Sequence, residues 1–257
     1  MDLPRYVPGH GLLAGKTVVV TAAAGAGIGS AVVRRCLEEG ARAVVLGDVH
    51  ERRLAEAHEA LGKEFGADRV ATAVCDVTVE EQVEELLDAA EAFGGVEVMV
   101  NNAGLGGTCS VLEMTDAQWG RVLDVTLTGT FRCVRAAGRR MRRGGVIVNN
   151  ASVVGWRAQE GQAHYAAAKA GVMALTRCAA LDLAPHGIRV NAVSPSLALH
   201  PFLEKVTSAE LLDELTGREA FGRAAQPWEV ANVVVFLASG YASYMTGEVV
   251  SVSSQHA

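Results

Sequence analysis

Short apolar runs alternate with longer amphipathic stretches along most of the chain. The apolar runs, rich in valine, isoleucine and alanine, predict seven buried strands: residues 16–21, 41–48, 69–76, 95–102, 144–150, 187–195 and 247–252. The stretches between them predict helices over about 27–39, 50–65, 79–94 and 116–140, and around Tyr165. The hydrophobic pattern therefore changes from strand to helix and back through most of the sequence.

Strands that alternate with helices imply a parallel sheet covered on both faces. We therefore expect the α/β class, with one doubly wound, Rossmann-type domain built on a seven-stranded parallel sheet. No linker, repeat or low-complexity tract interrupts the pattern, so this domain should run over residues 16–257. Residues 1–15 are rich in proline and glycine and predict an irregular N-terminal arm.

Composition narrows the class of protein. Half of the 257 residues are hydrophobic, which suffices for the core of one domain. The apolar runs are too short to span a bilayer and no secretory signal is evident, so we expect a cytoplasmic protein without a membrane partner. A net charge of −6 argues against nucleic-acid binding. The cysteines lack metal-ligand spacing, so we expect reduced thiols and no metal: Cys36, Cys75, Cys109, Cys133 and Cys178.

Glycines cluster where the first predicted strand turns into the first helix. Gly25, Gly27 and Gly29 leave the backbone bare, so that a pyrophosphate can approach the free N–H groups of the helix. A tight turn without a ligand could use the same glycines. The second strand ends in Asp48, about twenty residues further on, which favours a dinucleotide site.

Acidic and amide residues end the next strands. Asp48 can bind both ribose hydroxyls and would repel a 2′-phosphate, so we expect NAD in preference to NADP. The alternative for Asp48 is an N-cap, and Arg52 and Arg53 could soften the preference. Asp76 is placed for the adenine, or else caps a helix at Thr78. The segment 101–104 flanks the cofactor, or forms a plain turn.

Three residues carry the chemical signal. Tyr165 and Lys169 are four positions apart on a predicted helix, so they share one face. A nearby ammonium lowers the pKa of a phenol and makes proton exchange easier. Ser152 follows a buried strand and should lie at its carboxyl end, where open α/β sheets bind ligands. A surface helix could carry a tyrosine and a lysine by chance, but the serine and the glycine turn favour a catalytic site.

Taken together, these motifs resemble the short-chain dehydrogenase/reductase family from about Gly15 to Val252. The matching segments are Gly27-Ile28-Gly29, Asn102-Ala103-Gly104, Ser152, Tyr165-Ala-Ala-Ala-Lys169 and Arg189-Val190-Asn191. The resemblance implies that Tyr165 is the general acid/base, that Ser152 binds the substrate oxygen and that Lys169 binds the nicotinamide ribose. It implies cofactor contacts at Gly25, Gly27, Ile28, Gly29, Asp48, Asp76, Val77, Asn102, Ala103, Gly104, Pro195 and Leu197. A homotetramer is also implied.

Several positions depart from the family pattern. Ala22 stands where a glycine is usual, and the turn has one extra residue before Gly27. Thr126 replaces an asparagine that helps to hold a relay water, so the relay must use the backbone carbonyl there or be rerouted. Ser196 replaces a glycine after Pro195. The tail after the last strand reads Ser253-Ser254-Gln255 where Asp-Gly-Gly is usual.

Residues after strands four, five and six should line the substrate pocket: Leu105, Val153, Val154, Trp156, Gln159, Leu197, Leu199 and Phe202. This mostly apolar set suggests a bulky substrate with little charge, although Val153 and Leu199 could equally be packing residues. His200, which replaces a threonine, is a polar contact, a substrate ligand or a solvent-facing loop residue. The segment near 197–217 resembles the mobile substrate lid of the family. Arg139, Arg140, Arg142 and Arg143 should cap a helix, or else attract the phosphates of an acyl carrier.

The departures resemble an actinobacterial branch associated with steroid breakdown, whose members act on hydroxy-indane coenzyme A thioesters. The segments that carry this likeness are TAAAGAGIGSA, SPSLALHPF and TGEVVSVSSQ. The expected activity is NAD-dependent interconversion of a secondary alcohol and a ketone. A 3-oxoacyl-thioester reductase is the enzymatic alternative. A nucleotide-sensing protein without turnover is the alternative of another class, and it leaves the Ser152, Tyr165 and Lys169 set unexplained.

Overall fold

The sheet determines where the functional residues lie. A computed structural model describes residues 3–141, 144–199 and 209–254. Its strands form one parallel sheet in the order β3-β2-β1-β4-β5-β6-β7, which confirms the predicted architecture. Their bounds are β1 Thr17–Thr21, β2 Ala43–Asp48, β3 Val70–Val74, β4 Val98–Asn101, β5 Gly145–Asn150, β6 Ile188–Pro195 and β7 Val249–Val252.

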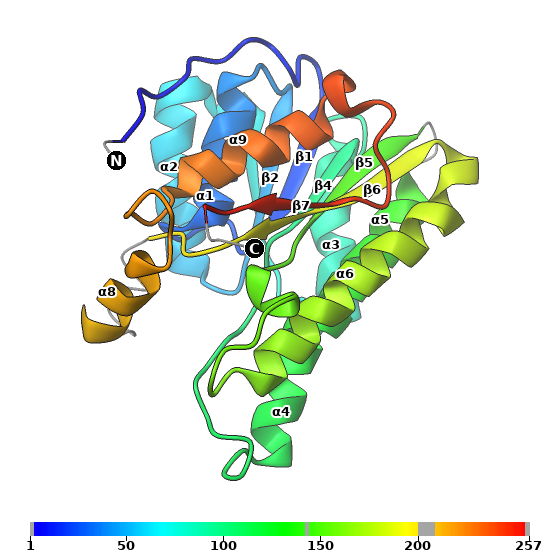
Figure 1. The fold of residues 1–257 in the computed structure, drawn as a ribbon. Helices are drawn as coiled ribbons and strands as arrows, with labels where there is room; N and C mark the ends of the chain where they lie inside the picture. The colour runs from blue at the N-terminus through cyan, green and yellow to red at the C-terminus, as the bar shows by residue number, and fades with distance from the viewer. Residues whose placement is uncertain (1–2, 142–143, 200–208, 255–257) are drawn as a thin grey trace.

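Helices cover both faces of this sheet (Figure 1). On one face lie α1 (Ile28–Glu38), α2 (Glu51–Phe65) and α9 (Pro227–Ala238); on the other lie α3 (Glu80–Glu91), α5 (Gly129–Arg140) and α6 (Ala163–Leu183). Alternate residues of β1 enter different cores, because Val18 and Val20 pack toward α1 whereas Val19 packs toward α3. A strand buried on both faces reads as a continuous apolar run, which explains why the sequence pattern located it.

Two helical regions differ from the pattern. The stretch predicted as one helix over 116–140 is α4 (Asp116–Leu123) and α5, separated by a π-helical turn over 124–128. Helix α9 was not predicted, because its apolar run NVVVFLA has no amphipathic period. It packs beside α1 (Figure 1). Within the described ranges, no helix combines the length and the apolar character needed to cross a bilayer.

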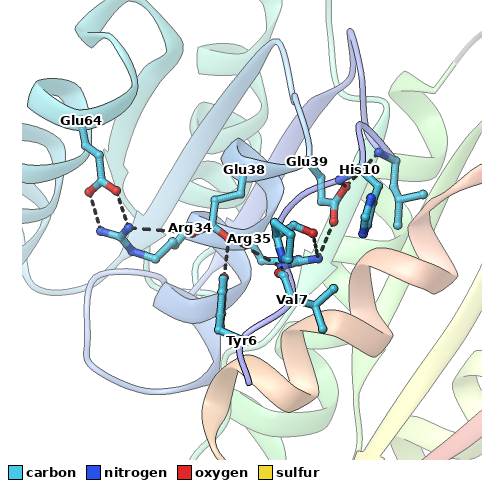
Figure 2. Close-up of polar contacts among 10 residues, drawn as sticks. Tyr6, Val7, His10, Arg34, Arg35, Glu38, Glu39 and Glu64 are labelled. Carbon is cyan, nitrogen blue, oxygen red and sulfur yellow. Dashed lines mark hydrogen bonds and ion pairs between the residues drawn. The ribbon is translucent and has the colours of Figure 1, made fainter. Parts of the chain in front are cut away.

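The N-terminal arm is irregular but firmly attached to the end of α1 (Figure 2). The Glu39 side chain is fully buried; it pairs with Arg35 at 2.6 Å and accepts hydrogen bonds from the backbone N–H groups of His10 and Leu12. Arg35 in turn donates to the carbonyl of Val7. The hydrogen bonds of a buried ion pair therefore hold the arm in place.

The strand order reverses between β1 and β4, so the connections from these strands leave the sheet in opposite directions. In open α/β folds the crevice at such a point, beside the carboxyl ends of the strands, binds ligands. The turn after β1, the segment after β4 and Ser152 after β5 all lie at this edge.

Candidate active site

The glycine turn after β1 is tightly packed. Ala22 has φ 50°, and it is the one non-glycine residue with positive φ in the described part of the chain. Its carbonyl oxygen faces Gly29 so closely that a Cβ on Gly29 would lie only 2.2 Å away. The same Cβ would lie 2.6 Å from Nδ2 of Asn102. Glycine at position 29 is therefore required by the protein itself, whatever ligand it binds.

The start of α1 can hold an anion. Gly27 is the N-cap, and no side chain caps the helix, so the first-turn N–H groups are available to a phosphate. A Cβ on Gly25 would meet open space apart from Gly27 N at 4.0 Å. The residues present thus fit a pyrophosphate at the predicted place.

Asp48 lies beside this turn and is nearly buried. One carboxylate oxygen accepts a hydrogen bond from Ala24 N at 3.0 Å, and the other accepts one from His50 N at 3.1 Å. His50 is the N-cap of α2. Asp48 therefore supports both the glycine turn and the start of α2, and each carboxylate oxygen can accept further hydrogen bonds.

Asp76 and Val77 have clear local roles. Asp76 accepts hydrogen bonds from the N–H and hydroxyl groups of Thr78 at 2.9 and 2.7 Å. These hydrogen bonds match the capping alternative predicted for Asp76, although α3 begins two residues after Thr78, at Glu80. Val77 is buried, and a Cβ on Gly129 would lie 2.5 Å from its side chain. The Val77 side chain is thus a core contact with α5.

The segment after β4 is bonded to the end of β1. The backbone N–H groups of Asn102 and Ala103 both donate to the Thr21 hydroxyl at 3.0 Å. Gly104 lies near Lys169, since a Cβ there would be 3.5 Å from its Nζ atom. The three predicted residues 102–104 therefore lie between the glycine turn and α6.

Ser152, Tyr165 and Lys169 come together as predicted. The Ser152 side chain interacts with the Tyr165 phenol and opposes the effect of burial on its pKa. Lys169 is one turn further along α6, and its Nζ lies 5.5 Å from the centre of the Tyr165 ring. Gly155 allows the segment after Ser152 to pack closely against α6, because a Cβ on Gly155 would lie 3.1 Å from the Lys169 backbone. The sequence pattern did not reveal the role of Gly155.

The electrostatics of this set correct one expectation. Lys169 was expected to lower the pKa of Tyr165, but burial raises the pKa of Tyr165 to about 12, and only the interaction with the Ser152 side chain opposes this rise. The Lys169 ammonium donates to the carbonyl of Asn150 instead of to the phenol. Burial lowers the pKa of Lys169 to about 8.

Thr126 is buried in the π-helical turn between α4 and α5. Its hydroxyl accepts a hydrogen bond from Leu105 N at 2.9 Å and donates to Leu105 O at 3.1 Å. Both hydrogen bonds hold the segment after β4 in place. A threonine thus braces the site here, and a relay through this hydroxyl would have to break one of them.

The predicted substrate side is only partly described. Trp156 is half-exposed, Val154 and Gln159 are partly buried, and Val153 is buried, so the last is a packing residue. Leu197 and Leu199 anchor the base of the predicted lid, since Leu197 O accepts from Ala225 N and Leu199 N donates to Ala225 O. Helix α8 (Ala209–Gly217) lies in this lid. His200 and Phe202 lie outside the described residues.

The two described residues of the basic cluster, Arg139 and Arg140, lie at the opposite edge of the sheet from Ser152. Arg139 and Arg140 form the last turn of α5, as the capping interpretation predicts. Arg140 pairs with Glu84 at 2.6 Å and also contacts Asp88. The end of α5 leads into the first residue of β5, whereas Ser152 follows its last residue, so the position of these two arginines gives no support to the alternative in which they attract the phosphates of an acyl carrier. Arg142 and Arg143 lie outside the described residues.

Comparison with known proteins identifies the family. Residues 22–254 match the family model described as enoyl-(acyl carrier protein) reductase. A short-chain dehydrogenase from Mycobacterium smegmatis superposes with a TM-score of 0.88 and 56% identity, over 100% of this chain and 99% of that one. The chain belongs to the short-chain dehydrogenase/reductase family.

Relatives of known activity refine this assignment. This short-chain dehydrogenase/reductase is 62% identical to the (5R,7aS)-5-hydroxy-7a-methyl-1-oxo-2,3,5,6,7,7a-hexahydro-1H-indene-carboxyl-CoA reductase of Mycobacterium tuberculosis, over 98% of the chain and 97% of that protein. It is 37% identical to the 3-oxoacyl-[acyl-carrier-protein] reductase FabG of Thermotoga maritima, over 93% and 97% respectively. The likeness to the steroid-degradation branch is confirmed, and the protein is an oxidoreductase. The non-catalytic alternative is therefore wrong.

Proposed function

We propose that this short-chain dehydrogenase/reductase interconverts a secondary alcohol and a ketone with NAD, using Tyr165 as the general acid/base. The observation that carries this proposal is the grouping of Ser152, Tyr165 and Lys169 at the carboxyl edge of the sheet, beside a glycine turn whose helix start is uncapped. Ser152 would orient the substrate oxygen toward the phenol. Lys169 would bind the nicotinamide ribose.

The proton chemistry follows from the buried phenol. A bound nicotinamide would supply or accept the hydride. Because the pKa of Tyr165 is raised to about 12, the phenol is protonated at neutral pH and can donate to a ketone oxygen. In the opposite direction Tyr165 must first lose its proton. Reduction should therefore be nearly independent of pH around neutrality, and oxidation should accelerate as the pH rises.

The choice of NAD rests on Asp48. Its carboxylate is nearly buried at the end of β2, beside the turn that would hold the pyrophosphate. Two hydroxyls of a ribose can donate to it, whereas a 2′-phosphate would meet a like charge. We propose that the other predicted residues also contact the cofactor: Asp76, Val77, Asn102, Ala103, Gly104, Pro195 and Leu197.

A hydroxy-indane coenzyme A thioester is the substrate that we propose. The support is the activity for which the Mycobacterium tuberculosis relative is named, since that protein aligns with nearly the whole chain. Trp156, half-exposed four residues after Ser152, offers an aromatic surface to such a bicyclic group. The 3-oxoacyl-thioester alternative has its support in the Thermotoga maritima relative, at lower identity.

We also propose a cytoplasmic homotetramer. Large apolar side chains are exposed on helices at the surface, such as Trp119 on α4, Phe131 on α5 and Phe236 on α9. These exposed side chains are compatible with the association that the family resemblance implies. All five cysteines are free thiols in the structure, which fits a reducing compartment. Light scattering on the purified chain would measure the number of subunits.

The deciding experiment is a substrate comparison. The purified enzyme is assayed for ketone reduction and alcohol oxidation with the hydroxy-indane thioester pair and with a 3-oxoacyl thioester, each with NAD(H) and NADP(H). We expect the largest kcat/KM for the indane pair with NAD(H). A larger kcat/KM for the 3-oxoacyl thioester would favour the alternative, and turnover of neither class would refute both substrates.

A further inference from the structure

Asn150 connects the catalytic helix to the cofactor side of the site. It is the last residue of β5, two positions before Ser152. Its backbone carbonyl accepts a hydrogen bond from the ammonium of Lys169. Its side-chain amide donates from Nδ2 to Oδ1 of Asn102 at 2.9 Å. One residue thus contacts both the catalytic lysine and the segment after β4.

Asn102 continues this connection to the glycine turn. Its Nδ2 donates to the carbonyl oxygens of Thr21 at 3.2 Å and Ala22 at 3.1 Å. An amide side chain could also be rotated to present its oxygen there, which would place acceptor against acceptor. The two carbonyls require the nitrogen of Asn102 to face the turn, and the Asn150 donor holds the oxygen on the other side. Asn150 therefore stabilises the orientation of the Asn102 amide that the turn requires.

A second asparagine pair, Asn101 and Asn149, lies on the opposite face of the sheet. Asn101 donates to Asn149 at 2.8 Å, and Asn149 donates to the Thr176 hydroxyl of α6 at 2.9 Å. Successive residues of a strand point to opposite faces. The side chains of Asn102 and Asn150 accordingly lie on the face that α1 covers, and the glycine turn leads into α1. Asn149 offers a matched control on the same strand.

The turn needs this support. Ala22 has the left-handed φ of 50°, which a residue with a Cβ adopts only under constraint. The Oδ1 atom of Asn150 is buried without a partner in the described residues, so Nδ2 carries the hydrogen bonding of that side chain. We infer that Asn150 is a positioning residue: it fixes the glycine turn for the dinucleotide through Asn102, while its carbonyl holds Lys169. The cofactor part of this inference rests on the proposed function.

The test begins with Asn150→Ala in the full chain. The variant keeps the backbone carbonyl that holds Lys169, and it loses the donor to Asn102. We expect faster hydrogen exchange at residues 22–29 relative to residues 18–20, measured without nucleotide, and NAD affinity lower by about fivefold, the effect of one hydrogen bond. kcat at saturating NAD should change less than the dissociation constant. Asn150→Asp keeps the volume but places a charged acceptor against the Asn102 oxygen, so it should weaken NAD binding at least as much as the alanine variant does.

Two comparisons make the result decisive. Asn149→Ala is expected to lower stability without changing the exchange ratio or the affinity for NAD. In the Asn102→Ala background, Asn150→Ala should cause no further loss of NAD affinity, because the side chain through which Asn150 acts is already absent. An unchanged exchange ratio in Asn150→Ala, or affinity losses that multiply in the double variant, would overturn the inference. If the wild type binds no NAD, the proposed function fails, and the exchange ratio alone decides the inference.

Discussion

The charged groups at the two edges of the parallel sheet have different partners. At the amino edge, Lys16 and Arg42 both pair with Glu97, at 3.1 and 2.6 Å. A groove of about 1290 Å³ lies along this edge. At the carboxyl edge, Lys169 is 2% exposed, and within the described residues it has a carbonyl group as its partner and no carboxylate. Hollow space thus lies beside paired charges, whereas the proposed active site holds a buried charge without a carboxylate partner among the described residues.

This difference shows how stability and reactivity are divided in the fold. At the amino edge, the half-exposed Lys16 and Arg42 stabilise each other's surroundings by sharing Glu97. At the other edge, burial shifts the pKa values of both Tyr165 and Lys169 away from their ordinary values. Shifted groups in a crevice are typical of functional sites. The predictions below perturb the two edges in turn.

Replacing the phenol should have the largest effect. Tyr165→Phe removes the proton donor and leaves α6 and its packing in place. We expect turnover to fall about 10²–10⁴-fold, the usual contribution of a positioned acid or base, with little change in NAD affinity. Steady-state kinetics and NAD titration would measure the two effects. Equal kcat in the wild type and the variant would remove Tyr165 from the mechanism.

Replacing Asp48 should change the choice of cofactor. In Asp48→Ala we expect NAD to bind about ten- to a hundredfold more weakly, because hydrogen bonds to a charged group are lost. NADP binding should weaken less, since the like charge is also removed. Asp48→Asn is the control, because it can still accept from Ala24 N. A greater loss for NADP than for NAD would overturn the assignment.

The sequence predicted the carboxyl edge better than its internal connections. Buried parallel strands read as apolar runs, so the positions of Asp48 and Ser152 at strand ends followed directly. The link between Asn102 and Asn150 did not, because it depends on the register of β4 against β5, across 48 positions of sequence. The brace formed by Thr126 was missed for the same reason, since its partner is a backbone group that only the folded chain brings near.

A smaller effect is expected at the glycine turn. Ala22→Gly removes the cost of a left-handed alanine, so we expect the free energy of unfolding to rise by about 1 kcal/mol. Ala24→Gly, in the same turn but without positive φ, should lower it by about 0.5–1 kcal/mol. Urea unfolding would compare the two variants. A loss of stability in both would show that φ at position 22 stores no strain.

The smallest effect is expected at the amino edge. Lys16→Met breaks a half-exposed ion pair, and exposed pairs contribute at most about 1 kcal/mol. Turnover should not change. A large loss of activity in this variant would mean that the two edges are coupled and that the contrast between them is mistaken.

The central claim is that the carboxyl edge holds a buried ammonium at a cost to the fold, and Lys169→Met tests it most directly. The pKa of Lys169 in the folded chain, about 8, is below the ordinary 10.5. The unfolded chain therefore binds this proton more tightly, so folding is penalised at neutral pH and the penalty fades as the pH rises toward 10.5. We expect Lys169→Met to lose turnover and to unfold with about 1–3 kcal/mol more free energy at pH 7, a gain that shrinks by pH 10. A variant less stable than the wild type at pH 7, or a difference independent of pH, would contradict the account.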